Sequence, residues 1–569
     1  MPNDKGWKPR LRNWITGRPG EEHVTLALSV VIGALVGLVV VAFILLTGRL
    51  AARMYPPGVE TAWRRVMVPA LGSLVTGYLL WKFFPQARGS GIPQTKFAIF
   101  VTEGYISLRT VIGKFVCCSA SLASGIALGR EGPSVHIGAG IASVLGRRCG
   151  LSPRNVKALI PVGASAALAA AFNTPIAAVL FSLEEVLGDM HAPVLGSVVL
   201  SSATSWMVLH LLLGDEPLFH VPPYHLVHPA EFLVYAVLGI VGGLGSASFV
   251  KLLLVMRVWF KRLPPSTRWF QPVAGGLLVG VLGLFLPEVL GVGYDYVEKV
   301  LGGDMLLRTV AVLAVLKIIA TATCYSSGNA GGIFGPSLFI GATLGGVVGS
   351  LAHAVFPSWT ASPGAYALVG MGAAFAGIVR TPLTSVIMIF EMTRDYSIIV
   401  PLMIANLISF FVSQRLQRQP IYEALAHQEG VFLPGDEARE HLAGMRVSDI
   451  LRKGLPLQAD ATLASLAERL QEANRNTWLV ARDGVLWGVI TRAEIMAAGH
   501  ARVVRDVVGP ESQFAYVHAD QPLSLALKKM GDAGLDILPV VSRADIRQLL
   551  GIVTLTETLN AYGLGRNDV

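Results

Sequence analysis

Charged side chains are scarce in this sequence. Asp, Glu, Lys and Arg make up 15% of its 569 residues, whereas soluble globular proteins carry about 25%. Hydrophobic residues make up 53%, and the mean hydropathy is +0.57. These values exclude an ordinary soluble protein and indicate an integral membrane protein. Most of the long apolar runs are near the ~20 residues with which a helix spans a bilayer; they cover residues 24–47, 66–84, 158–183, 191–213, 232–256, 271–292, 307–324, 365–391 and 398–413.

Cysteine is also rare. The chain has four, none with the spacing of a metal-binding set, and all lie in or beside apolar segments. We interpret them as buried thiols and not as a disulfide framework; they are Cys117, Cys118, Cys149 and Cys324. No nucleophile with a base partner is evident, which argues against an enzyme. The first apolar run is too long for a cleavable signal peptide and lacks a small-residue cleavage site.

The formal net charge is +9. The basic residues are not gathered into one domain with interleaved aromatics, so we expect no nucleic-acid partner. They crowd instead the arm before the first span, residues 1–21, and one short loop, residues 257–268. Loops rich in Lys and Arg stay on the cytoplasmic side of a membrane. We therefore expect both regions to be cytoplasmic.

One stretch, residues 128–140 (LGREGPSVHIGAG), places ionisable groups inside an apolar segment. Such groups are costly in a bilayer and mark functional sites. Gly132 and Pro133 fit the start of a helix, with Glu131 just before it. Unpaired N–H groups at that start would face the carboxylate, or an anion in its place. The alternative is a structural ion pair between Glu131 and Arg130.

A Gly-rich break, residues 88–94 (RGSGIPQ), separates two hydrophobic stretches at a depth where free backbone needs a partner or a water-filled cavity. Gly-Ser-Gly by itself is equally typical of a surface turn. Lys114 lies in the next apolar run. A lysine so placed either extends to an interface or acts electrostatically on an anion path, and both alternatives stay open.

The second half of the chain repeats the first. The sequence GPS at residues 132–134 recurs at 335–337, and the Thr-Pro pair at 174–175 recurs at 381–382. Paired segments interrupted by Gly and Pro are typical of repeat-built transporters, in which broken helices direct their positive N-termini at an anion. The carboxylate of Glu131 has no counterpart in the second copy, which indicates one titratable gate facing a backbone cradle. The repeat does not reveal whether the halves are inverted or parallel.

Together these segments resemble the CLC family of chloride channels and chloride/proton antiporters. The family signatures GSGIP, GREGP and GGIFxP match residues 89–93, 129–133 and 331–336, and a tyrosine near the end of the membrane domain matches Tyr422. The resemblance covers about residues 22–425. It implies an all-α polytopic membrane protein with an inverted repeat of tilted, partly re-entrant helices. It also implies a homodimer in which each subunit holds its own pathway.

The resemblance assigns site residues as well. It implies that chloride is bound by the hydroxyls of Ser90 and Tyr422 and by the backbone N–H groups of Ile333 and Phe334. Such donors hold a halide weakly enough for release. It further implies that Glu131 is the gating glutamate beside this site. The residues expected to support the site are Arg130, Gly132, Gly335 and Lys114.

The resemblance implies a mechanism of competition. Ionised Glu131 would take the anion position, and protonated Glu131 would swing away and admit chloride. Proton-coupled members carry a second, inner glutamate where channels have an apolar residue, and Glu185 matches that position. We therefore favour a chloride/proton antiporter over a passive, voltage- or pH-gated chloride channel. Its neighbour Glu184 points about 100° away on a helix and need not share the role.

Selectivity and three departures follow from the same comparison of motifs. Ser90 indicates chloride, because nitrate-preferring relatives carry proline in that position. Gly335 stands where alanine is common, which we expect to loosen the backbone cradle. Gln94 stands where glutamate often follows GSGIP, and Asn173 stands where the second copy has Arg380. The last two departures lie away from the expected site.

The C-terminal region differs in composition. Residues 488–494 (GVITRAE) recur 63 residues later as 551–557 (GIVTLTE), a tandem duplication that resembles a pair of CBS domains. In pairs that bind adenine nucleotides, an aspartate commonly follows the threonine by three residues. Glu494 and Glu557 take those places here, and their extra methylene displaces the oxygens. Adenine nucleotide binding and a purely structural, dimer-stabilising module remain equal alternatives.

The expected organisation is therefore a membrane domain with a cytoplasmic α/β module, in a bacterial inner membrane. Chloride and protons are the expected substrates, and no metal or other cofactor is expected. A CBS-containing divalent-cation transporter would need acidic residues along a path that offers mostly amides and hydroxyls. The expected segments are a cytoplasmic arm 1–21, a membrane domain 22–425 with repeats 22–215 and 232–425, a linker 426–445, and CBS domains 446–502 and 503–565.

Overall fold

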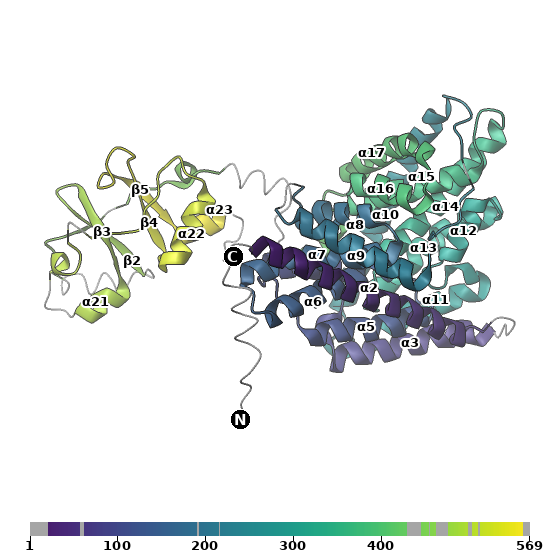
Figure 1. The fold of residues 1–569 in the computed structure, drawn as a ribbon, viewed down its shortest axis with the longest axis horizontal. Helices are drawn as coiled ribbons and strands as arrows, with labels where there is room; N and C mark the ends of the chain where they lie inside the picture. The colour runs from purple at the N-terminus through teal and green to yellow at the C-terminus, as the bar shows by residue number, and fades with distance from the viewer. Residues whose placement is uncertain are drawn as a thin grey trace. The chain divides into compact units, whose positions relative to one another are not determined.

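The computed structural model describes residues 21–56, 62–190, 193–215, 217–222, 224–429, 445–454, 456–462, 476–498, 503–509 and 512–561. The chain forms two compact units that divide between Leu433 and Pro434. Figure 1 shows packed helices in the first unit and strands with short helices in the second. Nearly all of the expected N-terminal arm and most of the expected linker lie outside the described residues.

The first unit is helical, and its described residues contain no β-strand apart from a two-residue bridge discussed below. In chain order its helices are α2 (Glu21–Met54), α3 (Ala62–Lys82), α4 (Ile92–Phe100), α5 (Leu108–Ala123), α6 (Glu131–Arg148), α7 (Pro153–Phe172), α8 (Pro175–Phe181), a π-helical turn (Ser182–Leu187), α9 (Leu195–Leu213), α10 (Glu231–Arg262), α11 (Pro272–Phe285), α12 (Tyr294–Gly302), α13 (Leu307–Ser326), α14 (Phe334–Val355), α15 (Pro363–Val379), α16 (Pro382–Thr393), α17 (Ile399–Leu416) and α18 (Ile421–Gln428).

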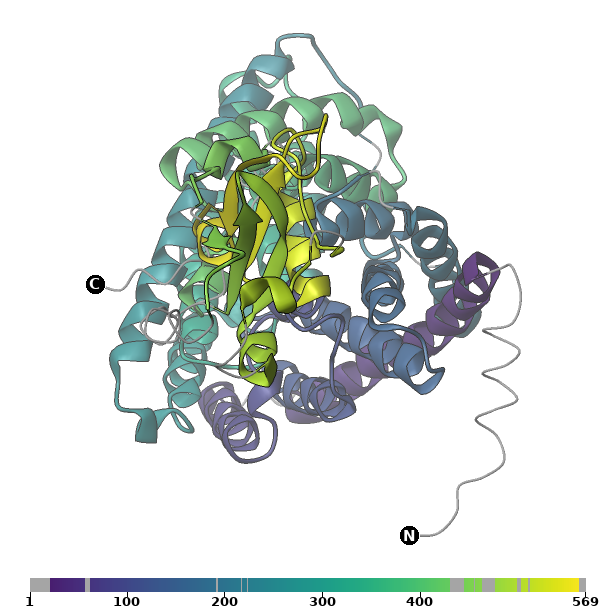
Figure 2. The same cartoon turned by 90° about the vertical axis from the view of Figure 1, so that its left-hand side faces the viewer.

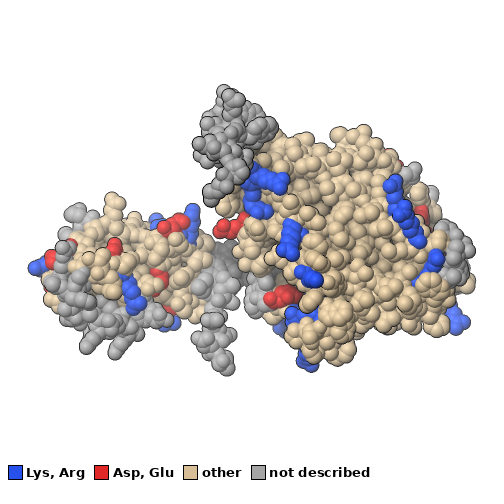
Figure 3. Space-filling view, turned by 90° about the horizontal axis from the view of Figure 1, so that it is seen from below, with Lys and Arg blue, Asp and Glu red and all other residues tan. Residues whose placement is uncertain are grey.

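Seven helical segments of the described chain are long and apolar enough to cross a membrane. One of them, α14, was missed among the predicted apolar runs, although its mean hydropathy exceeds that of α7 and α9. Two predicted runs, 158–183 and 365–391, are each broken in two. The breaks fall at Asn173 and Arg380, which both have left-handed backbone conformations and precede a Thr-Pro pair that starts the next helix. Figure 3 shows a largely uncharged surface on this unit, as expected for contact with lipid.

The two halves that share sequence motifs also pack their helices in the same way. Helix α6 packs on α7 through Gly138 and Gly163, and α14 packs on α15 through Gly341 and Gly370. A Cβ atom on any of these four glycines would overlap the carbonyl oxygen of the facing glycine. Small residues at such crossings let helix backbones approach closely within a membrane. The two glycine pairs therefore occupy equivalent places in the two halves.

Three of the four cysteines are buried, as predicted: Cys117, Cys118 and Cys324. The prediction was wrong for Cys149, which is partly exposed because it caps the end of α6. All four thiols are free, and the described residues contain no cluster of metal-ligating side chains.

The second unit contains two small sheets (Figure 2). In the first sheet, β2 (Thr477–Arg482) pairs antiparallel with β3 (Val485–Thr491) and parallel with β1 (Leu457–Gln458). In the second, β4 (Ile537–Val541) pairs antiparallel with β5 (Leu549–Thr554). A helix follows each hairpin, as the tandem duplication predicts. The helix after β3 is α21 (Arg492–Ala498) and the helix after β5 is α23 (Leu555–Ala561), whereas α22 (Leu523–Ala533) precedes β4.

Candidate functional site

Two helix N-termini meet inside the first unit. Gly129 and Gly332 exchange backbone hydrogen bonds, N–H to O=C, of 2.7 Å in each direction. Helices α6 and α14 begin two residues after these glycines, at Glu131 and Phe334. Glu131 is thus the first residue of its helix and not the residue before it. The positive ends of two helix dipoles converge on one place, which favours an anion there.

The Gly-Ser-Gly break joins the same place and is not a surface turn. Ser90 is fully buried. A Cβ atom on Gly132 would come within 2.5 Å of the Ser90 carbonyl oxygen, and one on Gly91 would overlap the Gly132 carbonyl. These contacts set the N-terminus of α4 against that of α6. The chain breaks at residues 90, 131 and 334 are therefore neighbours.

The Glu131 carboxylate lies at the N-terminus of α14. Glu131 is fully buried, and its Oε2 accepts the backbone N–H of Gly335 at 3.2 Å. Its Oε1 accepts the hydroxyl of Tyr294. The Arg130 guanidinium lies over the Tyr294 ring, 5.5 Å from its centroid. The alternative of an ion pair between Arg130 and Glu131 is not found among the described residues; the carboxylate instead takes a position that suits an anion.

Four hydrogen-bond donors beside this carboxylate lack acceptors within the described part of the chain. The Ser90 and Tyr422 hydroxyls are buried and make no hydrogen bond of regular geometry there, although Tyr325 lies close to Ser90. The same holds for the backbone N–H groups of Ile333 and Phe334 at the start of α14. Buried donors without partners are costly, so each such group calls for an explanation. A bound anion would give all four an acceptor.

Packed aromatic rings hold this backbone in place. The Phe334 ring is fully buried and lies 4.3 Å from the Phe375 ring, 4.7 Å from the Phe172 ring and 5.5 Å from the Phe181 ring, centroid to centroid. Helices α7, α8 and α15 supply these rings. The orientation of the Phe334 N–H group is thereby set by the core of both halves.

The second candidate glutamate has a cationic partner that sequence reasoning missed. Glu185 is 6% exposed, and its Oε1 lies 2.8 Å from Nζ of Lys96. Lys96 is carried by α4, the helix that begins just after Ser90. Tyr422 is within electrostatic range of both Glu185 and Glu131. The charge of Lys96 inside an apolar segment is the same signal that had pointed to Lys114.

The adjacent Glu184 has different partners, as its helical spacing predicted. Its Oε2 accepts the backbone N–H of Thr384 at 2.8 Å, at the start of α16. Glu391, its counterpart in the second half, accepts the N–H of Ala177 at 2.7 Å, at the start of α8. Each carboxylate satisfies free N–H groups of a helix in the other half. The pair holds the two halves together.

Lys114 does not extend to an interface. It is fully buried, and its Nζ donates to the carbonyl oxygen of Gly89 at 2.7 Å and to that of Arg88 at 3.4 Å. It therefore holds the loop before Ser90. Its counterpart 203 residues later, Lys317, donates to the carbonyl oxygen of Gly291 at 2.7 Å.

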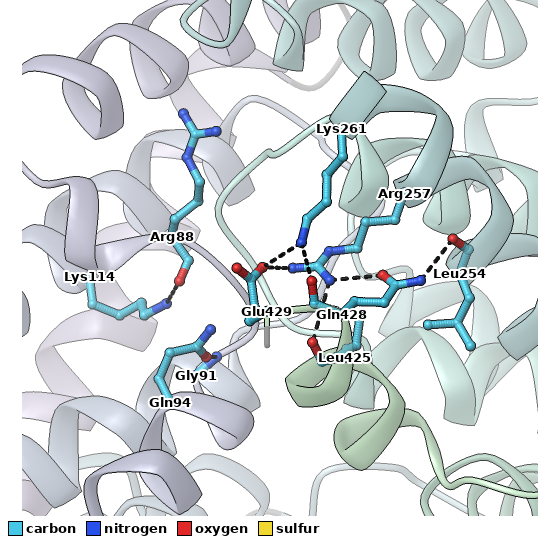
Figure 4. Close-up of polar contacts among 10 residues, drawn as sticks. All are labelled: Arg88, Gly91, Gln94, Lys114, Leu254, Arg257, Lys261, Leu425, Gln428 and Glu429. Carbon is cyan, nitrogen blue, oxygen red and sulfur yellow. Dashed lines mark hydrogen bonds and ion pairs between the residues drawn. The ribbon is translucent and has the colours of Figure 1, made fainter. Parts of the chain in front are cut away.

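A basic cavity of about 610 Å³ reaches this loop from one side, and we name it the Arg88 cavity. Its wall includes Gly89, Tyr325 and Ala426, and Figure 4 shows much of its charged lining. The single carboxylate among its lining residues, Glu429, pairs with Arg257 and lies 3.4 Å from Lys261. A positively lined cavity raises the local concentration of anions. Its basic residues are Arg88, Arg257, Lys261 and Arg268.

A second cavity of about 610 Å³, the Tyr294 cavity, is lined by the tyrosine whose hydroxyl contacts Glu131. Tyr294 and Arg130 both line it, together with Arg64 and Arg65. One basic cavity therefore reaches a direct partner of the buried carboxylate, and the other reaches the loop that carries Ser90.

The two glutamates of the duplicated C-terminal motif cap helices. Glu494 Oε2 accepts the backbone N–H of Thr491 at 2.7 Å and its hydroxyl at 2.8 Å, before α21. Glu557 Oε2 accepts the hydroxyl of Thr554 at 3.0 Å, before α23. Both carboxylates are therefore engaged within their own motifs.

Comparison with known proteins agrees with this geometry. The family model described as "Voltage gated chloride channel" matches residues 71–414, and the CBS domain model matches residues 504–563. The chain is 35% identical over 366 residues to a putative chloride channel protein ClcB-like of Ralstonia nicotianae, covering 63% of this chain and 85% of that protein. It is 32% identical over 381 residues to the H(+)/Cl(-) exchange transporter ClcA of Vibrio campbellii, covering 66% and 81%.

Solved structures show the same fold. A slow cyanobacterial Cl-/H+ antiporter matches with a TM-score of 0.64 and 27% identity, over 71% of this chain and 97% of that one. A eukaryotic CLC transporter matches with a TM-score of 0.67 and 21% identity, over 93% and 97%. The predicted helical membrane fold with a CBS pair is confirmed. The chain belongs to the voltage-gated chloride channel family, the CLC family.

Proposed function

We propose that this protein is an antiporter that exchanges chloride for protons, with Glu131 as its gate. The observation that carries the proposal is the hydrogen bond from the Gly335 N–H to the Glu131 carboxylate at the N-terminus of α14. An ionised carboxylate is attracted to that end of the helix and blocks it. A protonated one loses most of this attraction and can leave the position to chloride. One site then links the two ions by competition.

Chloride would be held by the hydroxyls of Ser90 and Tyr422 and by the N–H groups of Ile333 and Phe334. The support for this assignment is that these donors are buried beside the carboxylate without acceptors among the described residues. All four donors are neutral, so they stabilise an anion without the tight binding that a bare cation would add.

Glu185 would pass protons between Glu131 and the side of the Arg88 cavity. Its buried carboxylate pairs with Lys96 of α4, and Tyr422 lies within electrostatic range of both Glu185 and Glu131. Relatives named H(+)/Cl(-) exchange transporters support antiport over a passive channel. The proposal needs protonation of Glu185 to compete with its ion pair to Lys96.

Reconstituted vesicles test the proposal. An imposed chloride gradient is expected to drive uphill proton movement, read with paired chloride and pH electrodes. Glu131→Ala removes the titratable gate, so chloride flux should persist without proton coupling. Glu185→Val should also uncouple protons while chloride binding persists. If the unaltered protein moves no protons, the passive channel is favoured. If Glu131→Ala retains proton coupling, the assignment of Glu131 as the gate is contradicted.

We also propose a homodimer in a bacterial inner membrane, with the CBS pair in the cytoplasm. Helices α8, α9, α16 and α17 offer exposed apolar side chains that a second copy or lipid would cover, among them Ile176, Met207, Leu383, Met403 and Phe411. The basic segment 257–268, expected to be one loop, is the end of α10 and the turn after it; its Arg257, Lys261 and Arg268 line the Arg88 cavity. Basic residues near helix ends stay on the cytoplasmic side. Single-molecule photobleaching would count the subunits, and protease access to the C-terminal unit in oriented vesicles would test its side.

A further inference from the structure

The two basic cavities end at loops that are copies of one another. Residues 89–91 (Gly-Ser-Gly) precede α4, and Gly89 lines the Arg88 cavity. Residues 291–293 (Gly-Val-Gly) precede α12 and line the Tyr294 cavity. Both glycines of each loop have positive φ, between 62° and 107°. A buried lysine, Lys114 or Lys317, holds the carbonyl groups of each loop. The second loop reaches the same site, because Val292 lies beside Gly335 at the start of α14.

The two loops differ in where they carry a hydroxyl group. The first carries it on Ser90, between the glycines. The second has Val292 there, and its hydroxyl is on the next residue after the glycine, Tyr294, where the first copy has Ile92. The Tyr294 hydroxyl donates to Oε1 of Glu131, and no other described side chain donates to this carboxylate. The hydroxyl of the second loop thus contacts the gate and not the anion.

Packing holds Tyr294 in this position. Its ring lies edge-on to the Phe219 ring, with centroids 5.6 Å apart, and under the Arg130 guanidinium. Gly335 provides the space for its hydroxyl, because a Cβ atom on Gly335 would lie 2.9 Å from the Tyr294 Oη and 3.0 Å from Oε2 of Glu131. The glycine that we expected to loosen the cradle instead makes room for a third partner in it.

We propose that Tyr294 is a positioning residue that holds ionised Glu131 in the blocking position and closes the Tyr294 cavity against the anion site. A hydroxyl that donates to a carboxylate stabilises its charged form. Protonation of Glu131, and the movement that admits chloride from this side, must therefore break the Tyr294 hydrogen bond. The other charged or titratable groups near the carboxylate are Arg130 and Tyr422. This inference rests on the proposed function, since it assigns a partner to the proposed gate.

Tyr294→Phe tests the role, because it removes the hydroxyl and keeps the ring. Chloride flux into vesicles is measured as a function of external pH. The pH of half-maximal flux should rise by about one unit, a tenfold change in proton concentration that corresponds to about 1.4 kcal/mol. Tyr296→Phe is the matched control: Tyr296 lines the same cavity, and its ring contacts Lys299. Its pH profile should match that of the unaltered protein.

Two further variants test whether Tyr294 acts through Glu131 or whether its substitution disturbs the protein in general. In a Glu131→Ala background, Tyr294→Phe should leave the pH profile unchanged, because the carboxylate through which Tyr294 acts is gone. Gly335→Ala should displace the hydroxyl and raise the half-maximal pH in the same direction, and it also serves if Tyr294→Phe does not fold. A pH profile unaltered by both Tyr294→Phe and Gly335→Ala would overturn the inference, as would an equal shift in the Glu131→Ala background. Failure of the proposed function would appear separately, as absent proton coupling in the unaltered protein.

Discussion

Lys96→Met is the perturbation whose outcome the structure determines most directly. The ammonium group of Lys96 lies 2.8 Å from the Glu185 carboxylate, and 17% and 8% of the two side chains are exposed. Methionine keeps the length and the apolar stem and removes the charge. The buried carboxylate then loses its cationic partner, while the backbone of α4 and the Ser90 loop are unchanged.

The size of the effect follows from the burial of the pair. Removing one partner of a buried ion pair costs about 3–5 kcal/mol when the other partner stays charged. Because part of Lys96 is exposed, we take the lower end, about 3 kcal/mol. Glu185 avoids this cost by taking up a proton. One pH unit corresponds to about 1.4 kcal/mol, so the midpoint pH of proton-coupled transport should rise by about two units.

The assay is proton uptake driven by a chloride gradient in vesicles, recorded over a series of pH values on the side of the Arg88 cavity. Lys96→Arg keeps the charge and should keep the midpoint near its original value. Lys157→Met removes a charge near the same helix, where Lys157 lies over the Phe100 ring, and should leave the midpoint unchanged. A midpoint that does not move in Lys96→Met, together with lost coupling in Glu185→Val, would refute the reasoning.

Four other predictions concern stability and the C-terminal unit. Gly138→Ala should destabilise the membrane unit by about 1–3 kcal/mol, because its Cβ atom would overlap the Gly163 carbonyl. A Cβ atom on Gly48 would meet no atom within 4 Å, so the control Gly48→Ala should be neutral or slightly stabilising. Thermal unfolding measures both. Glu391→Gln should cost about 1 kcal/mol of stability, because it weakens the cap at the start of α8. Glu298→Gln, in the exposed pair with His220, is the control. An equal loss of stability in both variants would contradict the capping role of Glu391. Hydrogen bonds from Arg394 and His210 lower the pKa of Asp215 to about 2. The ionised Asp215 therefore stabilises the fold fully above its ordinary pKa of about 4, and this stabilisation is lost as pH falls toward 2. Asp215→Asn should remove this acid dependence of thermal unfolding. Titration of the whole protein with ATP is expected to show no saturable binding at micromolar concentrations, because Glu494 and Glu557 already accept hydrogen bonds within their own motifs. Saturable binding at these concentrations would favour the nucleotide-binding alternative.

Several features of the site were predictable because they depend on local chemistry. The Glu-Gly-Pro sequence favours the start of a helix, since proline suits the first turn and glycine permits close approach. The spacing of Glu184 and Glu185 likewise predicted different partners. Helix α14 was also within reach of the sequence, since its mean hydropathy is above that of α7 and α9, which were predicted.

Contacts between distant segments could not be predicted in this way. Lys96 and Glu185 are 89 residues apart, and Tyr294 and Glu131 are 163 residues apart, so no local pattern connects them. The contact of Gly335 with Tyr294 could not be predicted for the same reason. Its missing Cβ atom matters because of the Tyr294 hydroxyl, and only the folded chain brings the two together.

By itself the sequence determined that the chain lies in a membrane, that it is built from two related halves, and which segments break their helices. Each of these properties depends on composition or on neighbouring residues. The tertiary structure decided where the broken ends meet, which partners the buried charges take, and that a tyrosine from the second half holds the carboxylate of the first. Such pairings depend on how the two halves pack against each other, because a buried charge is stabilised by whichever donors the fold brings within reach.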